Sequence, residues 1–226
     1  MQAVILAAGR GTRMRHLTRE LPKSMLKIKG KPLLEHKLLT MPLKIKEVVI
    51  VVGYCGEHII KHFKQYYAGK RIIYVFQMNK NGTGGALHLA KTVLRDKFLV
   101  MMGDDFYHPK DISQIAKHDL AIMGHEVTDS SQFGIIKTNN YGHMVDVIEK
   151  PKRTKFNLAN TGLYMLNRNF FDYDLVPIGG GEFGLPQTLA KMSQKHKIKV
   201  EKARLWHPIS CPGDLKKAEE VVHLFR

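Results

Sequence analysis

Short apolar, β-branched runs alternate with helical patterns through the first half of the chain, and this alternation constrains the fold most. A strand–helix–strand–helix order folds into a parallel sheet with helices on both faces and right-handed crossovers. The expected strands cover Gln2–Ala8, Glu47–Val52, Arg71–Phe76 and Lys97–Met102. The expected helices between them cover Pro32–Met41, Gly56–Tyr67 and Thr83–Leu94. The sequence therefore predicts an α/β protein.

The pattern changes from about His118, where strands follow one another with few helices between them. These strands contain "LAIMGHEV", "FGIIKT", "HMVDVIEK" and "NLANTGLYML", and we expect them to extend the same sheet in antiparallel fashion. A helix near Glu182–Lys195 and a closing helix over Pro212–Leu224 should follow. Neither a linker nor a repeat is evident, and no hexapeptide pattern of a C-terminal β-helix is present. We expect a single domain over residues 1–226.

Composition limits the location and the partners of the chain. No apolar run approaches the length of a membrane span, and the N-terminus has no secretory pattern. Cys55 and Cys211 lie far apart without a CxxC pair, which indicates a reducing cytoplasm. The net charge of +16 favours anionic partners, but the lysines and arginines are spread along the whole chain. We therefore expect phosphorylated small molecules as partners, and neither nucleic acid nor a membrane.

The first predicted strand runs into a glycine-rich loop, "ILAAGRGTRM", at residues 5–14. Ligands of parallel sheets bind beyond the carboxyl ends of the strands, so this loop and "GDDFYH" after the fourth strand are the expected binding edge. The loop is not a P-loop, because no G-x-x-x-x-G-K-[ST] is present. A dinucleotide fingerprint requires a third glycine where Met14 stands, and the second strand lacks the acid that holds the ribose.

A third type of phosphate loop matches this sequence, because the further motifs that accompany such a loop follow it in order along the chain. "LAAGRGTRM" and "LPKSMLKIKGKPLLEH" precede "QMNKNGTGGAL", "MGDDF", "FGIIKT", "VIEKP", "NTGLYML", "GGGEFGL" and "PGDLKKA". Together they resemble the sugar-1-phosphate nucleotidylyltransferases over nearly the whole chain. The resemblance implies a Rossmann-like, mixed and mostly parallel sheet of the nucleotide-diphospho-sugar transferase type. It also implies attack by a sugar-1-phosphate, most simply a hexose-1-phosphate, on UTP, dTTP or GTP, with release of pyrophosphate.

The nucleotide side of the predicted site centres on the glycine loop. Gly9 and Gly11 allow backbone N–H groups to approach phosphates, and Thr12 adds a hydroxyl. The planar guanidinium of Arg13 matches phosphate oxygens. The resemblance implies that Lys23 reaches a phosphate and shields the attacking oxygen. It further implies contacts with the base and ribose from Leu6, Ala7, Ala8, Gln77 and Gly82.

The resemblance also assigns residues to the sugar phosphate. Glu149 would accept hydrogen bonds from sugar hydroxyls, and Lys150 would hold the sugar phosphate. Gly134, Asn160 and Thr161 are implied as further contacts, and Glu182 as an additional residue that reaches the sugar.

Asp104 is the expected ligand of Mg²⁺, because it follows a buried strand at the binding edge and carboxylates suit this cation. Its neighbour Asp105 should point elsewhere. The family's C-terminal motif carries a second metal-binding aspartate, but "WHPISCPGDL" places Pro208 at that position. Three alternatives stay open: Asp104 and the nucleotide phosphates hold the metal, His207 or another group assists, or the protein is weakly active or inactive.

Other hypotheses also stay open. "KNGTGGAL" and "MGDDFY" have some likeness to inositol-1-phosphate cytidylyltransferases, so CTP and a polyol phosphate are an alternative substrate pair. A nucleotide-binding homologue without turnover is another. His58 and His62 have the spacing of a zinc-binding helix, but Ile59 replaces the glutamate of such motifs, which indicates surface histidines. The sequence does not determine the oligomeric state, and a homo-oligomer is left open.

Overall fold

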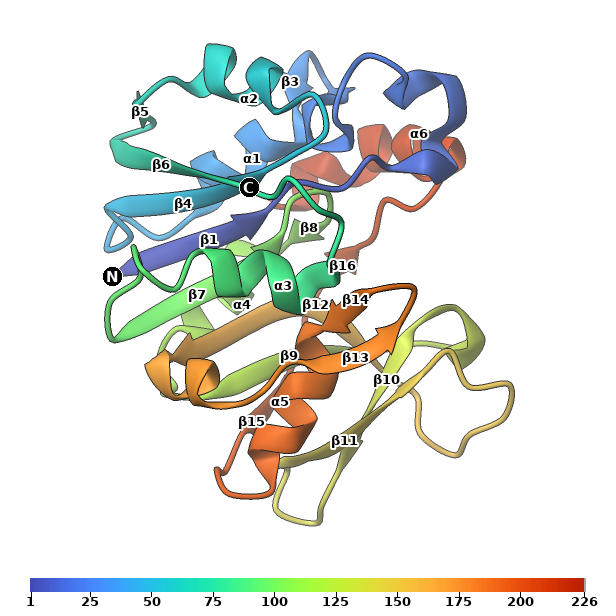
Figure 1. Ribbon diagram of the computed structural model, residues 1–226. Coiled ribbons are helices and arrows are strands. Elements are labelled where there is room, and N and C mark those ends of the chain that lie inside the picture. Colours follow the sequence, from blue (N-terminus) through green and yellow to red (C-terminus); the bar gives the residue numbers. More distant parts are fainter. Residues whose placement is uncertain (226) are drawn as a thin grey trace.

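The predicted parallel strands form the middle of one ten-stranded sheet in the computed structural model, which describes residues 1–225 (Figure 1). β1 (Gln2–Leu6) pairs in parallel with β4 (Glu47–Val52), which pairs in parallel with β6 (Lys70–Phe76). On its other side β1 pairs in parallel with β7 (Lys97–Met102). The strand predictions are confirmed, with β1 ending before Ala7 and β6 starting at Lys70.

The second half extends this sheet mainly with antiparallel strands, as predicted. β12 (Leu158–Asn167) pairs antiparallel with β7. It also pairs antiparallel with β9 (Ala121–Glu126) and β10 (Gly134–Thr138). β11 (Met144–Glu149) pairs with β10 in a hairpin. The edge strand β15 (Lys199–Lys202) departs from the prediction, because it runs parallel to β9. The sheet is therefore parallel at its centre and mixed beyond β7.

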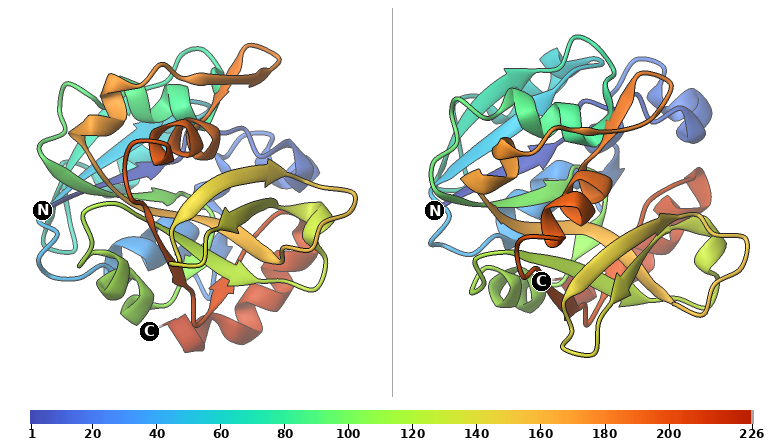
Figure 2. Two further views of the ribbon diagram at one scale, coloured as in Figure 1. Left: turned by 90° about the horizontal axis from the view of Figure 1, so that it is seen from below. Right: turned by 60° about the horizontal axis from the view of Figure 1, so that its bottom comes forward.

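Helices cover both faces of the sheet (Figures 1 and 2). Successive side chains of a strand point to opposite faces, and the buried residues of β1 divide accordingly. Ala3 and Ile5 belong to one apolar cluster and Val4 to another. The first cluster includes residues of α1 (Leu33–Thr40), α2 (Gly56–Phe63) and α4 (Pro109–Ile115), and the second includes residues of α3 (Gly82–Leu89) and α5 (Leu185–Ser193).

Several predicted helices are shorter than expected. The helix expected to reach Tyr67 ends at Phe63, because Lys64 adopts a left-handed φ of 51° and Tyr66–Tyr67 forms β5 against β6. The helix expected from Glu182 begins at Leu185, because Glu182–Gly184 forms β14 instead. The α3 helix likewise ends at Leu89 rather than Leu94.

A third apolar cluster joins the glycine loop to the C-terminal segment. It contains Met14, Leu26, Phe106, Ile209 and Ala218, among others. The remaining elements complete the chain: η1 (Thr12–Thr18), η2 (Lys23–Met25), β2 (Lys27–Ile28), β3 (Lys31–Pro32), β8 (Phe106–Tyr107), η3 (Ser130–Gln132), η4 (Arg168–Asp172), β13 (Val176–Gly179), β16 (Trp206–His207), α6 (Pro212–Val221) and η5 (Val222–Phe225). Within residues 1–225, none of the helices is long and apolar enough to cross a membrane.

The order of the central strands determines where a ligand can bind. From β1 the chain proceeds to β4 and β6 on one side and then returns to β7 on the other side. The loops that leave the carboxyl ends of β1 and β7 therefore diverge, and such a switch point leaves a crevice in an open α/β sheet.

Gly162 gives a testable prediction about the strand that adjoins this crevice. Its φ is +76°, and a Cβ there would lie 2.4 Å from Met102 Cγ. Gly30 has a similar φ of +80°, but no atom lies within 4 Å of its Cβ position. We expect Gly162→Ala to lower the free energy of unfolding by about 3 kcal/mol, through backbone strain and overpacking together. The matched control Gly30→Ala should lower it by only about 1 kcal/mol.

Urea unfolding followed by circular dichroism measures both values. Equal losses in the two variants would show that the contact with Met102 is not tight.

Candidate active site

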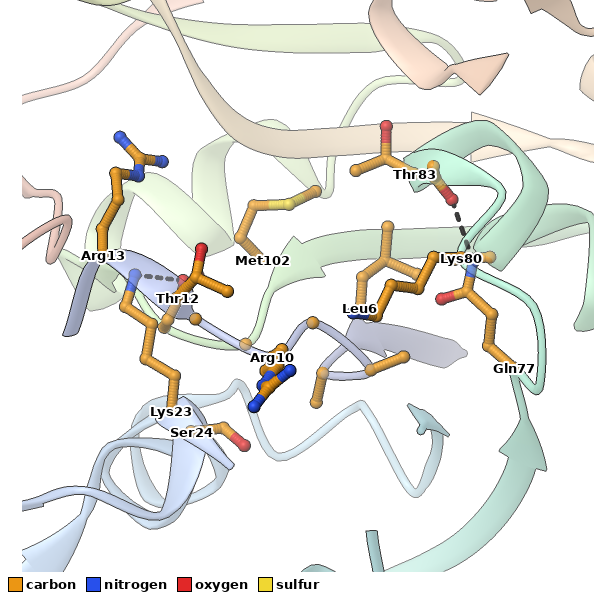
Figure 3. A pocket seen from close by; sticks show the side chains of 18 of the residues that line it. Leu6, Arg10, Thr12, Arg13, Lys23, Ser24, Gln77, Lys80, Thr83 and Met102 are labelled. Carbon is orange, nitrogen blue, oxygen red and sulfur yellow. Dashed lines mark hydrogen bonds and ion pairs between the residues drawn. The ribbon is translucent and has the colours of Figure 1, made fainter. Parts of the chain in front are cut away.

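A cleft of about 510 Å³ opens at the carboxyl ends of β1 and β7, at the switch point of the sheet. Concave sites of this size suit a small-molecule ligand. Predicted site residues account for half of its wall: Leu6, Ala7, Ala8, Gly9, Gly11, Thr12, Arg13, Lys23, Gln77, Gly82 and Asp104. Figure 3 shows Thr12, Arg13 and Lys23 on one side and Gln77, Lys80 and Thr83 on the other.

The glycine loop is held against Lys23 by close packing. Gly11 has a φ of +66°, and a Cβ there would lie 2.9 Å from Lys23 Cβ. Thr18 Oγ1 donates a hydrogen bond of 2.9 Å to Gly11 O and closes the loop from the other side. Glycine is therefore required at position 11 for both its backbone conformation and its lack of a side chain.

Lys23 and Asp104 meet inside the cleft although 81 positions separate them in the chain. Lys23 Nζ lies 2.5 Å from Asp104 Oδ2, and the side chains are 12% and 32% exposed. A pair of this kind places one positive and one negative group where a ligand would sit. Both groups can exchange partners when phosphates and a cation arrive, because each favours an opposite charge.

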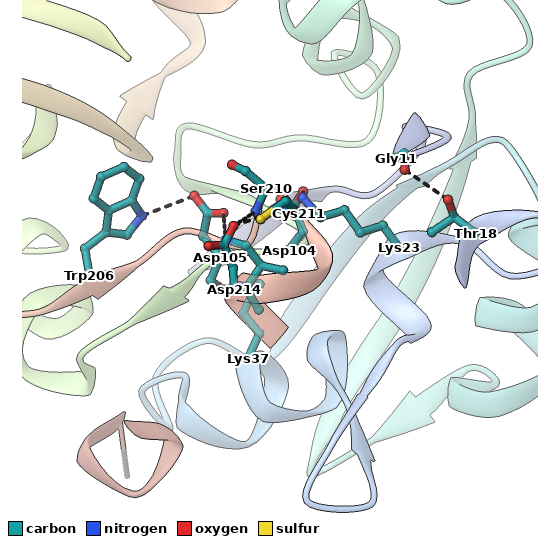
Figure 4. Close-up of polar contacts among 11 residues, drawn as sticks. Gly11, Thr18, Lys23, Lys37, Asp104, Asp105, Trp206, Ser210, Cys211 and Asp214 are labelled. Atoms are coloured by element: carbon teal, nitrogen blue, oxygen red, sulfur yellow. Dashed lines mark hydrogen bonds and ion pairs between the residues drawn. The ribbon is translucent and has the colours of Figure 1, made fainter. Parts of the chain in front are cut away.

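Asp105 turns away from the cleft, as expected (Figure 4). Its Oδ2 accepts from Trp206 Nε1 at 3.1 Å and its Oδ1 accepts from Ile209 N at 3.4 Å. The buried Lys37 of α1 donates from Nζ to Asp105 O. Removal from water lowers the pKa of Lys37 and raises the pKa of Asp105, which the Asp104 carboxylate raises further. These contacts fix the Asp104 loop to α1 and to the C-terminal segment.

Pro208 lies in that C-terminal segment, between β16 and Ile209, and so runs beside Asp105. The side chain of proline offers no metal ligand, and the correspondence of Pro208 to the family's second aspartate stays a prediction. His207 Nε2 lies 3.1 Å from Asp214 O, an acceptor that requires a proton on this nitrogen, so Nε2 is engaged as a donor. Among residues 1–225, no three His, Cys, Asp or Glu side chains gather into a metal site.

Asp104 alone nevertheless fits a magnesium site that the substrate completes. Mg²⁺ is commonly bound through one or two carboxylates, substrate phosphates and water rather than an all-protein cage. Asp104 is one of two carboxylates on the cleft wall, and the other, Glu182, lies on the β13–β14 hairpin.

Gln77 has a fixed orientation on the opposite wall. Its Nε2 donates to Asn81 Oδ1 at 2.6 Å and to Gly82 O at 3.1 Å. Because a backbone carbonyl can only accept, the amide nitrogen must face Gly82. Gln77 Oε1 therefore remains the acceptor that this side chain can offer to a ligand.

The β13–β14 hairpin closes the cleft near Gln77. Phe183 N donates to Asn81 O at 2.9 Å, and Leu185 N donates to Thr83 Oγ1 at 3.1 Å. A Cβ on Gly82 would lie 2.4 Å from Phe183 O, so the hairpin packs against a position that only glycine can occupy. Glu182 reaches the cleft from this hairpin, and its contact with the sugar stays a prediction.

Apart from Glu182, the residues predicted for the sugar and its phosphate lie outside the wall of this cleft. Gly134 and Glu149 are cross-strand partners, and a Cβ on Gly134 would lie 3.1 Å from Glu149 Oε2. Lys150 Nζ lies 3.8 Å from Glu149 Oε1, and both side chains are about half exposed. The pair is therefore accessible on the antiparallel part of the sheet.

Asn160 and Thr161 stand on β12, next to the cleft. Asn160 Nδ2 donates to Tyr164 Oη at 2.8 Å, and its Oδ1 accepts from Gly162 N at 3.0 Å. Thr161 is 1% exposed, and its hydroxyl donates to Met123 O, so the structure gives this hydroxyl a partner in the core. The roles of both residues stay predictions.

Sequence reasoning missed several residues of the wall and its support. Arg10 and Ser24 lie inside quoted motifs but carried no assignment, and Lys80 lies in the segment of Gln77. Lys37 had a usable signal, since it is a lysine among leucines on the buried side of an expected helix. Thr83, Met102, Gly103, Ile178 and Ser210 also line the cleft without having been predicted.

Comparison with known proteins agrees with this geometry. The family model described as nucleotidyl transferase matches residues 2–211. AglF of Haloferax volcanii, a UTP–glucose-1-phosphate uridylyltransferase, is 33% identical over 97% of this chain and 96% of its own length. The bifunctional protein GlmU of Methanococcus maripaludis strain C7 is 34% identical over 96% of this chain but 53% of its own length. The chain thus spans about half the length of these GlmU relatives.

Solved structures share the fold. A UDP-glucose pyrophosphorylase complexed with UDP-glucose superposes with a TM-score of 0.86 at 21% identity, covering 100% of this chain and 99% of that one. A putative glucose-1-phosphate thymidylyltransferase from Bacillus anthracis gives a TM-score of 0.85 at 22% identity, covering 98% and 95%. The matched family model and the relatives above 30% identity confirm the resemblance seen in the motifs, and the chain belongs to the nucleotidyl transferase family, among the sugar-1-phosphate nucleotidylyltransferases.

Proposed function

We propose that the chain joins a hexose-1-phosphate to UTP or dTTP and releases pyrophosphate. The observation that carries this proposal is that the glycine loop, Arg13, Lys23 and Asp104 all line one cleft. The match to AglF over nearly the full length of both chains supports the same reaction class. We further propose that residues 1–226 act as one nucleotidyltransferase domain and that the reaction is cytoplasmic, since Cys55 and Cys211 are both free.

The main task of such a site is to bring two anions together. Two unit charges 4 Å apart repel by about 4 kcal/mol at an intermediate effective dielectric. Arg13 and Lys23 reduce this repulsion by donating to phosphate oxygens, with backbone N–H groups of the glycine loop beside them. Asp104 would hold Mg²⁺ together with the nucleotide phosphates, and the ion would supply further positive charge. Lys23 loses its carboxylate partner in that state and becomes available to the substrate.

Gln77 supports the choice of base. Its Oε1 is an acceptor, which complements the N3–H of uracil or thymine. Cytosine has no hydrogen at N3, so CTP fits this group less well. Guanine has an N1–H that matches an acceptor, and GTP therefore belongs in the test.

Pro208 favours a second candidate, a homologue that binds nucleotide or nucleotide sugar without turnover. A matrix of UTP, dTTP, GTP and CTP against glucose-1-phosphate, mannose-1-phosphate and inositol-1-phosphate, read as pyrophosphate release, separates the candidates. We expect release with UTP or dTTP and a hexose-1-phosphate. Binding without release in every combination would support the second candidate, and release only with CTP and inositol-1-phosphate would support the cytidylyltransferase alternative.

The first prediction from this proposal concerns Arg13. Arg13→Ala should lower kcat/KM about 100-fold, because it removes a charge-assisted contact with the triphosphate. Its matched control is Arg15→Ala, an exposed arginine that lies outside the cleft wall. Steady-state pyrophosphate release should be near normal for the control, and thermal unfolding should be unchanged for both. A near-normal rate in Arg13→Ala would refute its role.

The second prediction concerns Asp104. Asp104→Asn should lower turnover about 100-fold, since the bound metal contributes several kcal/mol of charge stabilisation. The residual rate should no longer rise when Mg²⁺ is titrated. Asp119→Asn serves as the control, because Asp119 is 89% exposed and pairs only with Lys97 among the contacts of residues 1–225. An unchanged Mg²⁺ titration in Asp104→Asn would exclude this carboxylate as the metal ligand.

A further inference from the structure

Ser24 is a buried polar residue on the wall of the cleft that has no role in the reaction described above. It is 3% exposed and stands between Lys23 and Met25 in the 3₁₀ helix η2. Its Oγ finds no hydrogen-bond partner among residues 1–225. His125 Nδ1 and Gln187 Oε1 are also buried without a partner, but neither residue lines the cleft. Ser24 therefore combines an unsatisfied hydroxyl with a place at the binding site.

An unsatisfied buried hydroxyl is unfavourable in the ligand-free protein. Leaving such a group without a partner costs about 1–3 kcal/mol, and most buried polar atoms are hydrogen-bonded for this reason. The backbone does not require serine here, since η2 is maintained by Met25 N donating to Pro22 O and Leu26 N donating to Lys23 O. Alanine would fit in the same space and allow the same backbone hydrogen bonds, without the cost of an unsatisfied hydroxyl. A local loss of stability at a binding site points to a functional use of the group.

The neighbouring charges identify the kind of atom that can satisfy Ser24. Arg10, Arg13 and Lys23 line the same cleft, so anionic oxygens are the ligand atoms that gather there. A hydroxyl beside an anionic oxygen donates a hydrogen bond to it. Serine needs only a change of its χ1 rotamer to redirect Oγ, while the hydrogen bonds of η2 keep its Cα in place beside Lys23.

We propose that Ser24 is a positioning residue whose Oγ–H donates to a phosphate oxygen of the bound nucleoside triphosphate. This role rests on the proposed function, because it requires that the cleft binds a nucleotide. Binding supplies the acceptor that the ligand-free molecule lacks, so the penalty in the free state is relieved only in the complex. Ser24 thereby holds the triphosphate in register with Lys23, the adjacent residue that contacts Asp104.

The experiment compares Ser24→Ala with Ser193→Ala in the full-length chain. The hydroxyl of Ser193, at the end of α5, donates to Ala190 O at 2.7 Å and to Val145 O at 3.2 Å, so it is a partnered hydroxyl outside the cleft wall. Thermal unfolding is measured without ligand and with titrated Mg·UTP, with dTTP, GTP and CTP in parallel. Pyrophosphate release gives KM for nucleotide and for glucose-1-phosphate separately.

Ser24→Ala should unfold at the same temperature as the wild type or at a higher one without ligand. Its dissociation constant for UTP should rise about tenfold, the effect of one hydrogen bond to a charged acceptor, while KM for glucose-1-phosphate changes less than about twofold. Ser193→Ala should show the opposite pattern, with a lower ligand-free unfolding temperature and unchanged UTP affinity.

Two results would overturn the role of Ser24 alone. One is wild-type UTP affinity in Ser24→Ala, and the other is a clear fall of its ligand-free unfolding temperature, which would assign the hydroxyl a structural role. A wild-type protein that responds to none of the four nucleotides would instead refute the proposed function, and the role of Ser24 with it.

Discussion

The close approach of three backbone segments at the carboxyl end of β1 is the constraint on which the site depends. Ala7 N donates to Val51 O and Gly103 N donates to Leu6 O, both at 2.9 Å, so the chain after β1 is bonded to both neighbouring strands. A Cβ on Gly53 would lie 2.9 Å from Ala8 O, and a Cβ on Gly103 would lie 2.9 Å from Leu6 O. Side chains at these two positions would force the loops apart, and the floor of the cleft would be lost.

The charged side chains on the cleft wall favour an anionic ligand. Arg10, Arg13, Lys23 and Lys80 face two carboxylates, Asp104 and Glu182, so cations are in excess. Lys23 forms a direct ion pair with Asp104 in the ligand-free protein. The local excess of positive charge suits a triphosphate, whose charge exceeds that of any single carboxylate.

Most of the fold could be predicted because local patterns and burial agree. The runs at β4 and β7 are β-branched or apolar and lie between turn residues, and both strands have the predicted bounds. The α2 helix ends earlier than predicted because Lys64 adopts a left-handed backbone conformation. The hydrophobic periodicity of the sequence does not indicate this conformation. Residues Glu182–Gly184 fall within the predicted helix but form β14, because pairing with β13 stabilises them rather than their own propensity.

The residues predicted for the nucleotide line one cleft because they belong to contiguous motifs at strand ends, and their contacts with a nucleotide stay predictions. Ser24 was missed because its importance comes from burial without a hydrogen-bond partner, a property that only the folded chain reveals. Lys37 was missed because its backbone acceptor, Asp105 O, comes from a distant part of the sequence. The positions of the residues predicted for the sugar phosphate depend on long-range pairing. The reversal of strand direction between β7 and β12 places Gly162 against Met102, where parallel pairing ends. That junction is created by long-range strand pairing, and it turns the Thr161 hydroxyl toward Met123 O while leaving Glu149 and Lys150 accessible.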